Sequence, residues 1–207
     1  CISGYKVDEC TGDELPGWDI TITNGTYTAT ATTNASGYYE FCGLEPGDYD
    51  LSETLKPGYV AGATPGTVTV GCDNLTNQNF TNTELVCISG YKVDECTGDE
   101  LPGWVITLNN SSYTATATTN ASGYYEFCGL EPGSYTLKET LKPGYVAGTT
   151  PGTVTVGCNN LTDQNFTNTE LVCISGYKVD ECTGDELPDW VITLNNSSYT
   201  ATATTNA

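Results

Sequence analysis

The sequence predicts an all-β protein built from tandem immunoglobulin-like sandwiches, and three observations lead to this fold class. A unit that begins CISGYKVDECTGDELP starts at Cys1, Cys87 and Cys173, so the chain repeats with a period of 86 residues. Within each unit, short segments alternate apolar and polar residues, and clusters of Gly, Pro, Asn and Asp separate them. No segment has the period of an amphipathic helix.

The repeats define the expected domains. Residues 1–86 form the first repeat, residues 87–172 form the second, and residues 173–207 begin a third repeat that is incomplete. We expect this incomplete copy to contain the first three strands of the unit. The copies differ at few positions, which indicates recent duplication, so agreement between them says little about functional constraint.

Each unit is predicted to contain seven strands. Trp18, Ile20 and Ile22, for example, alternate with polar residues, which places the three apolar side chains on one face. Seven short strands fit a sandwich of two sheets. If the strands run up and down, their odd number leaves the first and last residues of a unit at opposite ends, or poles, of the sandwich. Consecutive units then form a linear rod. The expected strands of the first unit are residues 1–7, 18–23, 26–33, 37–44, 49–55, 67–71 and 77–83.

Charge and cysteine content exclude several classes of function. The 207 residues include 26 acidic and 6 basic residues and no histidine, for a net charge of −20, which argues against nucleic-acid binding and against adhesion to anionic membranes. No apolar run approaches the roughly 18 residues of a membrane-spanning helix. Ten cysteines without histidine indicate disulfides, and therefore an oxidising, extracellular location.

Following the strands from pole to pole predicts the disulfide pairs. Cys1, Cys42 and Cys72 fall at one pole of the unit and Cys10 at the other. A bond between Cys1 and Cys10 is the alternative, but a strand of about 8 residues separates them by over ~20 Å, and a disulfide tolerates about 7 Å between Cα atoms. We therefore predict Cys42–Cys72 and Cys128–Cys158 within repeats, Cys10–Cys87 and Cys96–Cys173 between neighbouring repeats, and partners beyond this stretch for Cys1 and Cys182.

One segment of each unit carries a family pattern. Residues 37–60 read GYYEFCGLEPGDYDLSETLKPGYV and fit G-x-Y-x-F-x-x-L-x-x-G-x-Y-x-L-x-E-x-x-x-P-G-Y, which recurs from Gly123 to Tyr145. This pattern resembles the collagen-adhesin B-type repeat (Cna-B) and its serine-aspartate-repeat B-like relatives, and the likeness extends over the whole repeat. The resemblance implies prealbumin-like stalk domains of prokaryotic surface adhesins and pili.

The resemblance also implies a crosslink, because some members of that family form a Lys–Asn isopeptide bond beside a buried acid. The matching positions are Lys6, Glu53 and Asn82, and in the second copy Lys92, Glu139 and Asn168. Strand alternation independently places the lysine, the acid and the asparagine on inward faces. Two non-covalent interpretations stay open: a buried ion pair with the asparagine as a hydrogen-bond partner, or a glutamate at the strand end that reaches solvent.

Two kinds of surface site are further candidates. Asp8, Asp13 and Glu14 surround an acidic turn where related repeats bind calcium, although a solvated turn explains them as well. Asn-x-Ser/Thr sequons predict N-linked glycans, and outward threonines could carry O-linked sugars. The sequon asparagines are Asn24, Asn34, Asn74, Asn79, Asn109, Asn110, Asn120, Asn160, Asn165, Asn195 and Asn196.

These observations favour an extracellular structural protein, a stiff, disulfide-crosslinked and glycosylated stalk or filament on a prokaryotic cell surface. Its expected partners are neighbouring copies of the same repeat. An adhesin whose repeats bind a carbohydrate or a protein, and a calcium-dependent surface-layer or matrix protein, are the alternatives. No catalytic residue and no cofactor is expected, since the sequence has no histidine, no nucleophile elbow and no phosphate-binding loop.

Overall fold

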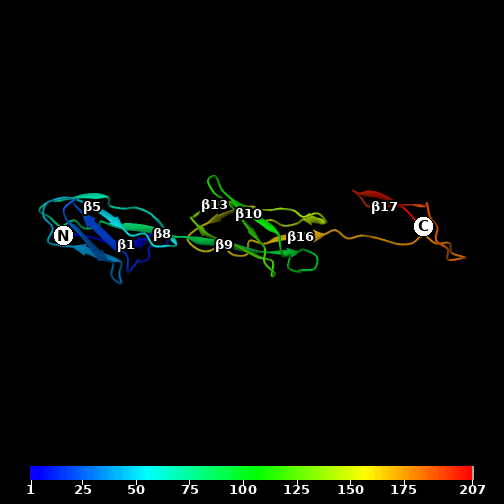
Figure 1. Cartoon of the computed structure of the whole chain (residues 1–207), viewed down its shortest axis with the longest axis horizontal. Coiled ribbons are helices and arrows are strands. Elements are labelled where there is room, and N and C mark those ends of the chain that lie inside the picture. Colours follow the sequence, from blue (N-terminus) through cyan, green and yellow to red (C-terminus); the bar gives the residue numbers. More distant parts are fainter. Residues whose placement is uncertain (207) are drawn as a thin grey trace. The chain divides into compact units, whose positions relative to one another are not determined.

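The alternating segments form strands in the computed structural model, which describes residues 1–206. Residues 1–84 form two four-stranded sheets with the orders β4-β1-β8-β6 and β3-β2-β5-β7 (Figure 1). The strands are β1 (Ile2–Asp8), β2 (Asp19–Thr23), β3 (Thr28–Thr32), β4 (Tyr38–Phe41), β5 (Gly47–Glu53), β6 (Tyr59–Ala61), β7 (Thr67–Val70) and β8 (Phe80–Glu84).

Residues 86–170 repeat this architecture, with sheet orders β12-β9-β16-β14 and β11-β10-β13-β15. The tandem all-β sandwich predicted from the sequence is confirmed, with one additional strand in each repeat, β6 and its counterpart β14. The strands are β9 (Val86–Asp94), β10 (Val105–Asn109), β11 (Thr114–Thr118), β12 (Tyr124–Leu130), β13 (Gly133–Glu139), β14 (Tyr145–Ala147), β15 (Thr153–Val156) and β16 (Phe166–Glu170).

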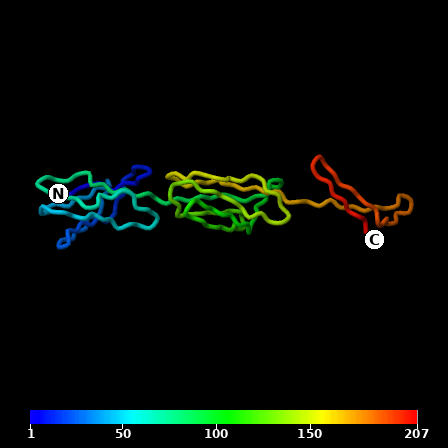
Figure 2. Tube along the Cα trace, turned by 90° about the horizontal axis from the view of Figure 1, so that it is seen from above, coloured from blue at the N-terminus to red at the C-terminus, as the bar shows by residue number. Residues whose placement is uncertain are grey.

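The first and last strands of each complete repeat are parallel neighbours. In repeat 1, β1 pairs with β8 in the register Lys6↔Phe80 and Asp8↔Asn82. A chain that enters at the start of β1 therefore leaves from the opposite end of the sandwich at the end of β8. Figure 2 shows the chain of each complete repeat running back and forth between its two ends.

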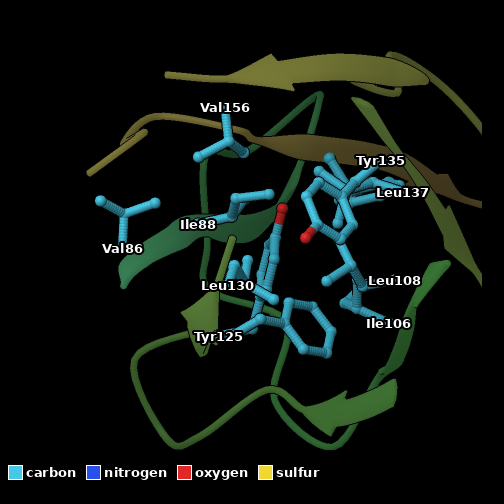
Figure 3. Packing of buried hydrophobic residues seen from close by; sticks show 11 residues of the cluster. Val86, Ile88, Ile106, Leu108, Tyr125, Leu130, Tyr135, Leu137 and Val156 are labelled. Atoms are coloured by element: carbon cyan, nitrogen blue, oxygen red, sulfur yellow. The ribbon is translucent and has the colours of Figure 1, made fainter. Parts of the chain in front are cut away.

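Inward-facing side chains of both sheets form one core in each complete repeat. In repeat 2, Ile88 and Tyr125 from one sheet meet Leu108 and Leu137 from the other, and all four are at most 2 % exposed (Figure 3). Burial of such side chains is the main stabilising contribution to a sandwich of this size. The outward faces carry threonines instead, whose hydroxyls bond across strands, as Thr21 and Thr30 do at 2.9 Å.

The third copy is a separate compact unit, Leu171–Ala207, and it is less ordered into strands than we predict. Of the three expected strands, the second and third are present as a hairpin of β17 (Val191–Asn195) and β18 (Thr200–Thr204). The first is not formed in the described residues, since residues 174–180 make only one isolated bridge, between Val179 and Glu186. The sequence up to Asn206 contains no counterparts of β4 and β8, the strands that hold β1 on both sides.

Cysteines pair differently from the prediction within a repeat. Cys42 and Cys128 bond to Cys1 and Cys87, rather than to Cys72 and Cys158. The reason is the antiparallel pairing of β1 with β4, in which Ile2 lies opposite Phe41. The residues just outside that pair are Cys1 and Cys42, whose Cα atoms are 4.1 Å apart.

A disulfide also joins repeat 1 to repeat 2, but with a partner that differs from the expected one. Cys10 bonds to Cys158, with 5.5 Å between the Cα atoms, and not to Cys87, which is already bonded to Cys128. The predicted bond between Cys96 and Cys173 is absent from the described residues. The cysteines that remain free there are Cys72, Cys96, Cys173 and Cys182.

Candidate functional site: a buried lysine, glutamate and asparagine

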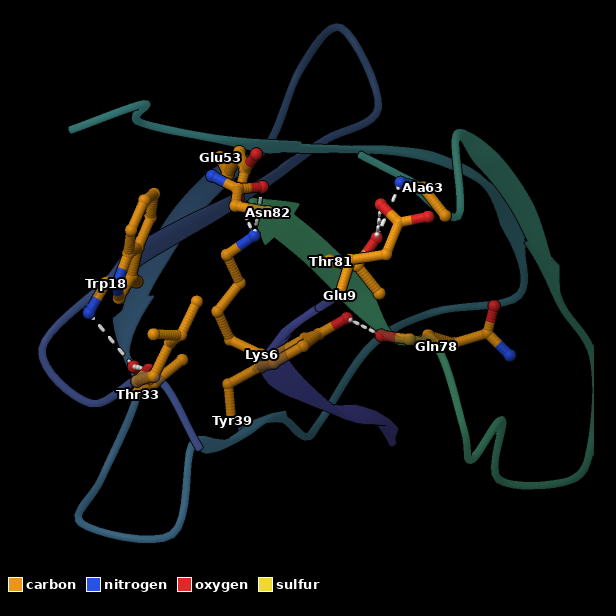
Figure 4. A network of polar contacts seen from close by, with 11 residues as sticks. Lys6, Glu9, Trp18, Thr33, Tyr39, Glu53, Ala63, Gln78, Thr81 and Asn82 are labelled. Carbon is orange, nitrogen blue, oxygen red and sulfur yellow. Dashed lines mark hydrogen bonds and ion pairs between the residues drawn. The ribbon is translucent and has the colours of Figure 1, made fainter. Parts of the chain in front are cut away.

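Three polar side chains from three strands meet inside repeat 1 (Figure 4). Lys6 on β1 and Asn82 on β8 belong to one sheet, and Glu53 at the end of β5 reaches them from the other. Strand alternation aims all three inward, since Lys6 and Asn82 are 0 % exposed and the Glu53 side chain is 6 % exposed. The residues that the family resemblance singles out are therefore brought together.

The contacts within the cluster are close. Lys6 Nζ lies 2.6 Å from Glu53 Oε2 and donates a hydrogen bond to Asn82 Oδ1. Asn82 Nδ2 is buried and has no hydrogen-bond partner in the described part of the chain. Leaving a buried amide nitrogen without a hydrogen-bond partner costs free energy. The presence of Asn82 Nδ2 at this place therefore needs an explanation.

Aromatic rings surround the amine. The indole of Trp18 lies 4.7 Å from Lys6 Nζ and the ring of Phe80 lies 5.9 Å from it. Tyr59, on the unpredicted strand β6, packs its ring edge-on against Trp18 at 5.2 Å. These rings exclude water from the amine, and their faces stabilise its positive charge only in part.

Burial changes the protonation of the lysine. Desolvation lowers the pKa of Lys6, and the neighbouring Glu53 and Asp8 oppose this shift. The fraction of molecules in which this amine is neutral is therefore larger than for a lysine in water. Only the neutral amine is a nucleophile.

Repeat 2 contains the same cluster in a slightly different arrangement. Lys92 Nζ lies 2.9 Å from Glu139 Oε2, and burial lowers the pKa of Lys92 as well. Asn168 is 0 % exposed, and neither its Oδ1 nor its Nδ2 has a hydrogen-bond partner among the residues described. In the third copy, Lys178 lies 4.9 Å from the ring of Trp190, but the sequence there contains no counterpart of the glutamate or the asparagine.

The arrangement can perform one chemical step. The amine of Lys6 is positioned against the side-chain amide of Asn82, and a carboxyl group lies beside both. Attack on Asn82 Cγ would form an Nζ–Cγ bond, break the Cγ–Nδ2 bond and release ammonia, with Glu53 carrying protons between the groups. Such a step would occur once per repeat and would not turn over.

The carboxylates of the acidic turn hold the backbone and side chains of that turn in place by hydrogen bonds. Asp8 Oδ1 accepts hydrogen bonds from the backbone N–H groups of Cys10 and Thr11, both at 2.9 Å. The Thr11 hydroxyl donates a hydrogen bond to Asp13 Oδ2, also at 2.9 Å. Within residues 1–206, Asp8, Asp13 and Glu14 do not form a cluster tight enough to hold a metal ion. Sequence reasoning missed this capping role of Asp8, although an Asp two residues before a Cys-Thr-Gly turn is a recognisable signal.

Where the side chain of a sequon asparagine makes a hydrogen bond, its Oδ1 is the acceptor. Asn24 and Asn34 accept backbone hydrogen bonds within their own turns, while Asn79 accepts one at 2.9 Å from the backbone of Tyr5. In the part of the chain that the structure describes, no sequon Nδ2 donates a hydrogen bond. The nitrogen to which an N-linked sugar attaches is therefore free, and the side chains are exposed or half-buried.

Sequence comparison places both complete repeats in one known group. Residues 2–84 and 87–170 each match the family model described as the SpaA prealbumin-like fold domain. The described residues form no helix that is long and apolar enough to span a membrane.

Two curated surface proteins of staphylococci are similar to the chain. Serine-aspartate repeat-containing protein F of Staphylococcus epidermidis is 29 % identical over 205 residues, which cover 80 % of this chain and 13 % of that protein. Serine-aspartate repeat-containing protein D of Staphylococcus aureus (strain Newman) is 30 % identical over 183 residues, which cover 72 % of this chain and 13 % of that protein. The chain thus spans about an eighth of the length of these relatives.

Solved structures show a weaker likeness. The Bacillus anthracis TIE protein gives a TM-score of 0.46 at 24 % identity, covering 99 % of this chain and 41 % of that one. The shaft pilin SpaA from Lactobacillus rhamnosus GG gives a TM-score of 0.41 at 15 % identity, covering 84 % of this chain and 98 % of that one.

Proposed function

Because the chain belongs to the family of SpaA prealbumin-like fold domains, we propose that its repeats form a crosslinked and glycosylated spacer in a cell-surface stalk or filament. Domains of this family are structural or adhesive parts of extracellular surface proteins and are not enzymes. The finer proposal, a stiff spacer, depends chiefly on the disulfide between Cys10 and Cys158, which fastens one repeat to the next. Only the single residue Leu85 separates β8 from β9, so the joint offers little free chain in any case.

Small-angle X-ray scattering of the whole chain tests the stiffness of the joint. We expect the double variant Cys10→Ser/Cys158→Ser to give a broader distribution of interatomic distances than the parent chain, because the two repeats can then hinge. The matched control is Cys173→Ser/Cys182→Ser, which also removes two cysteines but leaves the joint intact. Identical scattering from all three proteins would refute a disulfide-stiffened spacer.

A second part of the proposal is the crosslink inside each repeat. Support comes from the buried cluster, in which the amine of Lys6 contacts both Glu53 and Asn82 while Asn82 Nδ2 has no other partner. A covalent bond between β1 and β8 would prevent either strand from leaving the sandwich. It would also remove the buried charge of the lysine, which otherwise disfavours folding.

Intact-mass spectrometry of the reduced and denatured chain tests this crosslink. We expect the parent to be lighter than its sequence by one ammonia for each complete repeat. The variants Glu53→Ala and Glu139→Ala should each restore one ammonia, because the carboxyl that carries the protons is then gone. Lys178→Arg in the third copy is the control and should leave the ammonia loss unchanged. A parent mass equal to the sequence mass would leave the cluster as a non-covalent ion pair.

Glycosylation is the third part of the proposal, supported by the free Nδ2 groups of the exposed sequons. Sugars on these turns and loops would shield neighbouring strand edges that otherwise pair with other chains. Peptide mapping of the protein purified from its native source tests this, and sugar-free sequon peptides throughout would contradict it.

An adhesive role is the second candidate, and one observation favours it. Tyr5, 43 % exposed, packs against Tyr38 on the outer face of a sheet with 5.4 Å between ring centroids, and Tyr91 repeats this with Tyr124. Paired aromatic rings are a surface on which sugars can stack. Glycan-array binding that Tyr5→Ala and Tyr91→Ala abolish would support this role, and no binding by the parent would exclude a carbohydrate ligand at the tyrosines.

A further inference from the structure

Each complete repeat carries a pair of tyrosines on the outer face of one sheet. In repeat 1, Tyr5 on β1 lies directly opposite Tyr38 on β4, and in repeat 2, Tyr91 on β9 lies opposite Tyr124 on β12. The ring centroids are 5.4 Å apart in both pairs, and the ring planes are inclined by 60° and 59°. Antiparallel strand pairing therefore holds two phenols beside each other at the same place in both repeats.

Both rings of each cross-strand pair are accessible from solvent. Tyr5 and Tyr91 are each 43 % exposed, and their partners are half-buried. Tyr27 and Tyr49 are also neighbours, but their ring centroids are 6.5 Å apart and Tyr49 is 2 % exposed. An oxidant in solution therefore reaches both rings of a cross-strand pair, whereas it reaches only one ring of the pair that Tyr49 forms.

Repeat 2 has a proton acceptor beside its pair. The Tyr124 hydroxyl donates a hydrogen bond to Glu126 Oε1 at 2.9 Å, and this bond is the main cause that raises the pKa of Tyr124. A phenol that loses an electron becomes a strong acid, so the adjacent carboxylate is in place to accept its proton. In the described part of repeat 1, the matching hydroxyl of Tyr38 makes no such bond to Glu40.

The geometry of the pairs favours coupling within a repeat. Two tyrosyl radicals couple through the ring carbons ortho to their hydroxyl groups. Radicals on separate molecules must meet by diffusion, whereas the strands already hold the two rings of a pair together, so their coupling is intramolecular. Exposed side chains reorient within about picoseconds to nanoseconds, which lets the two ortho carbons turn toward each other. The net charge of −20 also keeps separate chains apart.

We propose that the pairs Tyr5–Tyr38 and Tyr91–Tyr124 are sites of oxidative crosslinking, where dityrosine fastens the first strand of each complete repeat to its antiparallel neighbour. The oxidant is hydrogen peroxide, used by a haem peroxidase. Each phenol loses one electron and one proton, and the two ortho carbons then form a carbon–carbon bond. The hydrogen on each of these carbons moves to the phenolic oxygen of its own ring. One peroxide takes up the two electrons and two protons and becomes two water molecules.

The dityrosine bond would complement the disulfide on the same pair of strands. Cys1 and Cys42 join β1 to β4 at one end of their ladder, and Tyr5 and Tyr38 lie opposite each other at the other end. A reductant breaks the disulfide but not a carbon–carbon bond, so β1 and β4 would stay joined in a reducing environment. This inference goes beyond the proposed lysine–asparagine crosslink, which would join β1 to a different strand, β8.

The test treats the whole chain with a haem peroxidase and hydrogen peroxide, and then reduces and denatures it. Compared with the untreated chain, we expect the monomer to be lighter by two hydrogen atoms for each complete repeat and to show dityrosine fluorescence. Peptide mapping should link β1 with β4 and β9 with β12. Tyr5→Phe and Tyr91→Phe should each remove one of these bonds. The control Tyr27→Phe/Tyr113→Phe removes two tyrosines of similar exposure, 44 % and 43 %, and should leave both bonds.

Two results would overturn the proposal. One is a treated monomer of unchanged mass, with dityrosine found only in bonds between chains. The other is dityrosine within the monomer whose yield Tyr5→Phe/Tyr91→Phe leaves unchanged, because such bonds would come from other tyrosines. Neither result bears on the spacer function, whose own test is the scattering of Cys10→Ser/Cys158→Ser.

The rates of the two bonds test the role of the carboxylate. In the parent chain, the bond in repeat 2 should form faster than the bond in repeat 1, because Glu126 accepts the proton of Tyr124. Glu126→Gln should slow the bond in repeat 2 to the rate of repeat 1 and leave repeat 1 unchanged. Equal rates in the parent and in Glu126→Gln would refute Glu126 as the proton acceptor.

Discussion

Repeat 2 and the third copy have nearly the same sequence over their first 34 residues, but only one of them is folded into a sandwich. Trp104 is 2 % exposed and Ile106 is 0 % exposed, whereas their counterparts Trp190 and Ile192 are 52 % and 48 % exposed. The difference shows that these residues do not form the core by themselves. They become a core only when strands from much later in the repeat cover them.

What the third copy retains is local. Its hairpin has the register Val191↔Thr204, which matches Val105↔Thr118 in repeat 2, and a short turn connects its two strands. The strand that the third copy lacks is the counterpart of β9, whose partners β12 and β16 are distant in sequence. Non-local pairing of this kind is typical of immunoglobulin-like sandwiches and makes them fold slowly.

The largest expected difference between the two copies concerns the tryptophan. Trp104→Ala removes a buried side chain and should lower the free energy of unfolding of repeat 2 by about 3–5 kcal/mol. Trp190→Ala, its control, should change stability by less than about 0.5 kcal/mol, as exposed positions usually do. Hydrogen exchange in rising denaturant measures the first effect at the amides of β10 and the second at the matching amides of β17. Equal effects would mean that the third copy has a packed core.

The next effect concerns a glycine that a neighbouring backbone approaches closely. A Cβ atom at Gly90 would lie 2.1 Å from the Gln164 carbonyl oxygen, while one at Gly176 would meet nothing within 4 Å. Gly90→Ala should therefore cost about 1–3 kcal/mol through overpacking, and Gly176→Ala should cost nothing measurable. Thermal unfolding of the two variants compares them directly. A neutral Gly90→Ala would show that the loop before β16 can move away.

A smaller effect should be common to both copies, because the acidic turn is local. Backbone hydrogen bonds from Thr97 and Cys96 lower the pKa of Asp94, and those from Thr183 and Cys182 lower the pKa of Asp180. Since the pKa of Asp94 is lower in the folded state, its stabilising contribution is complete above the usual value of 3.8 and is lost as the pH falls through the folded value.

Carbon NMR of the carboxyl groups checks this prediction. Both aspartates should titrate below the ordinary value, and Asp94→Asn should reduce the loss of stability of repeat 2 in acid. If Asp180 titrated at the ordinary value, the turn would depend on the complete sandwich.

The smallest effect is expected from chelation. The Asp8 carboxylate is already occupied by backbone hydrogen bonds, so removal of calcium should leave the melting temperature of the complete repeats unchanged. Scanning calorimetry with and without a chelator measures this. A drop of several degrees would revive the calcium-dependent surface protein as the better interpretation.

Local pattern was enough to predict most of the fold and the inward direction of the cluster. The alternation around Ile20 and around Phe80 gave the strands and their faces, and the family resemblance pointed to Lys6, Glu53 and Asn82. The short strand β6 was missed because three residues after a Pro-Gly pair carry too little pattern.

The disulfide partners could not be predicted from local sequence pattern, for a different reason. They depend on which strands are neighbours, and nothing in the residues of β1 or β4 says that these two strands pair. Pole assignment was correct for Cys10 and Cys158, but it could not choose among the three cysteines that share one pole.

The parallel pairing of β1 with β8 has a mechanical consequence. Tension along the chain pulls on these two strands at opposite ends, so it slides one past the other instead of peeling them apart. The hydrogen bonds between them are then loaded in shear, and several must break together before the sandwich opens.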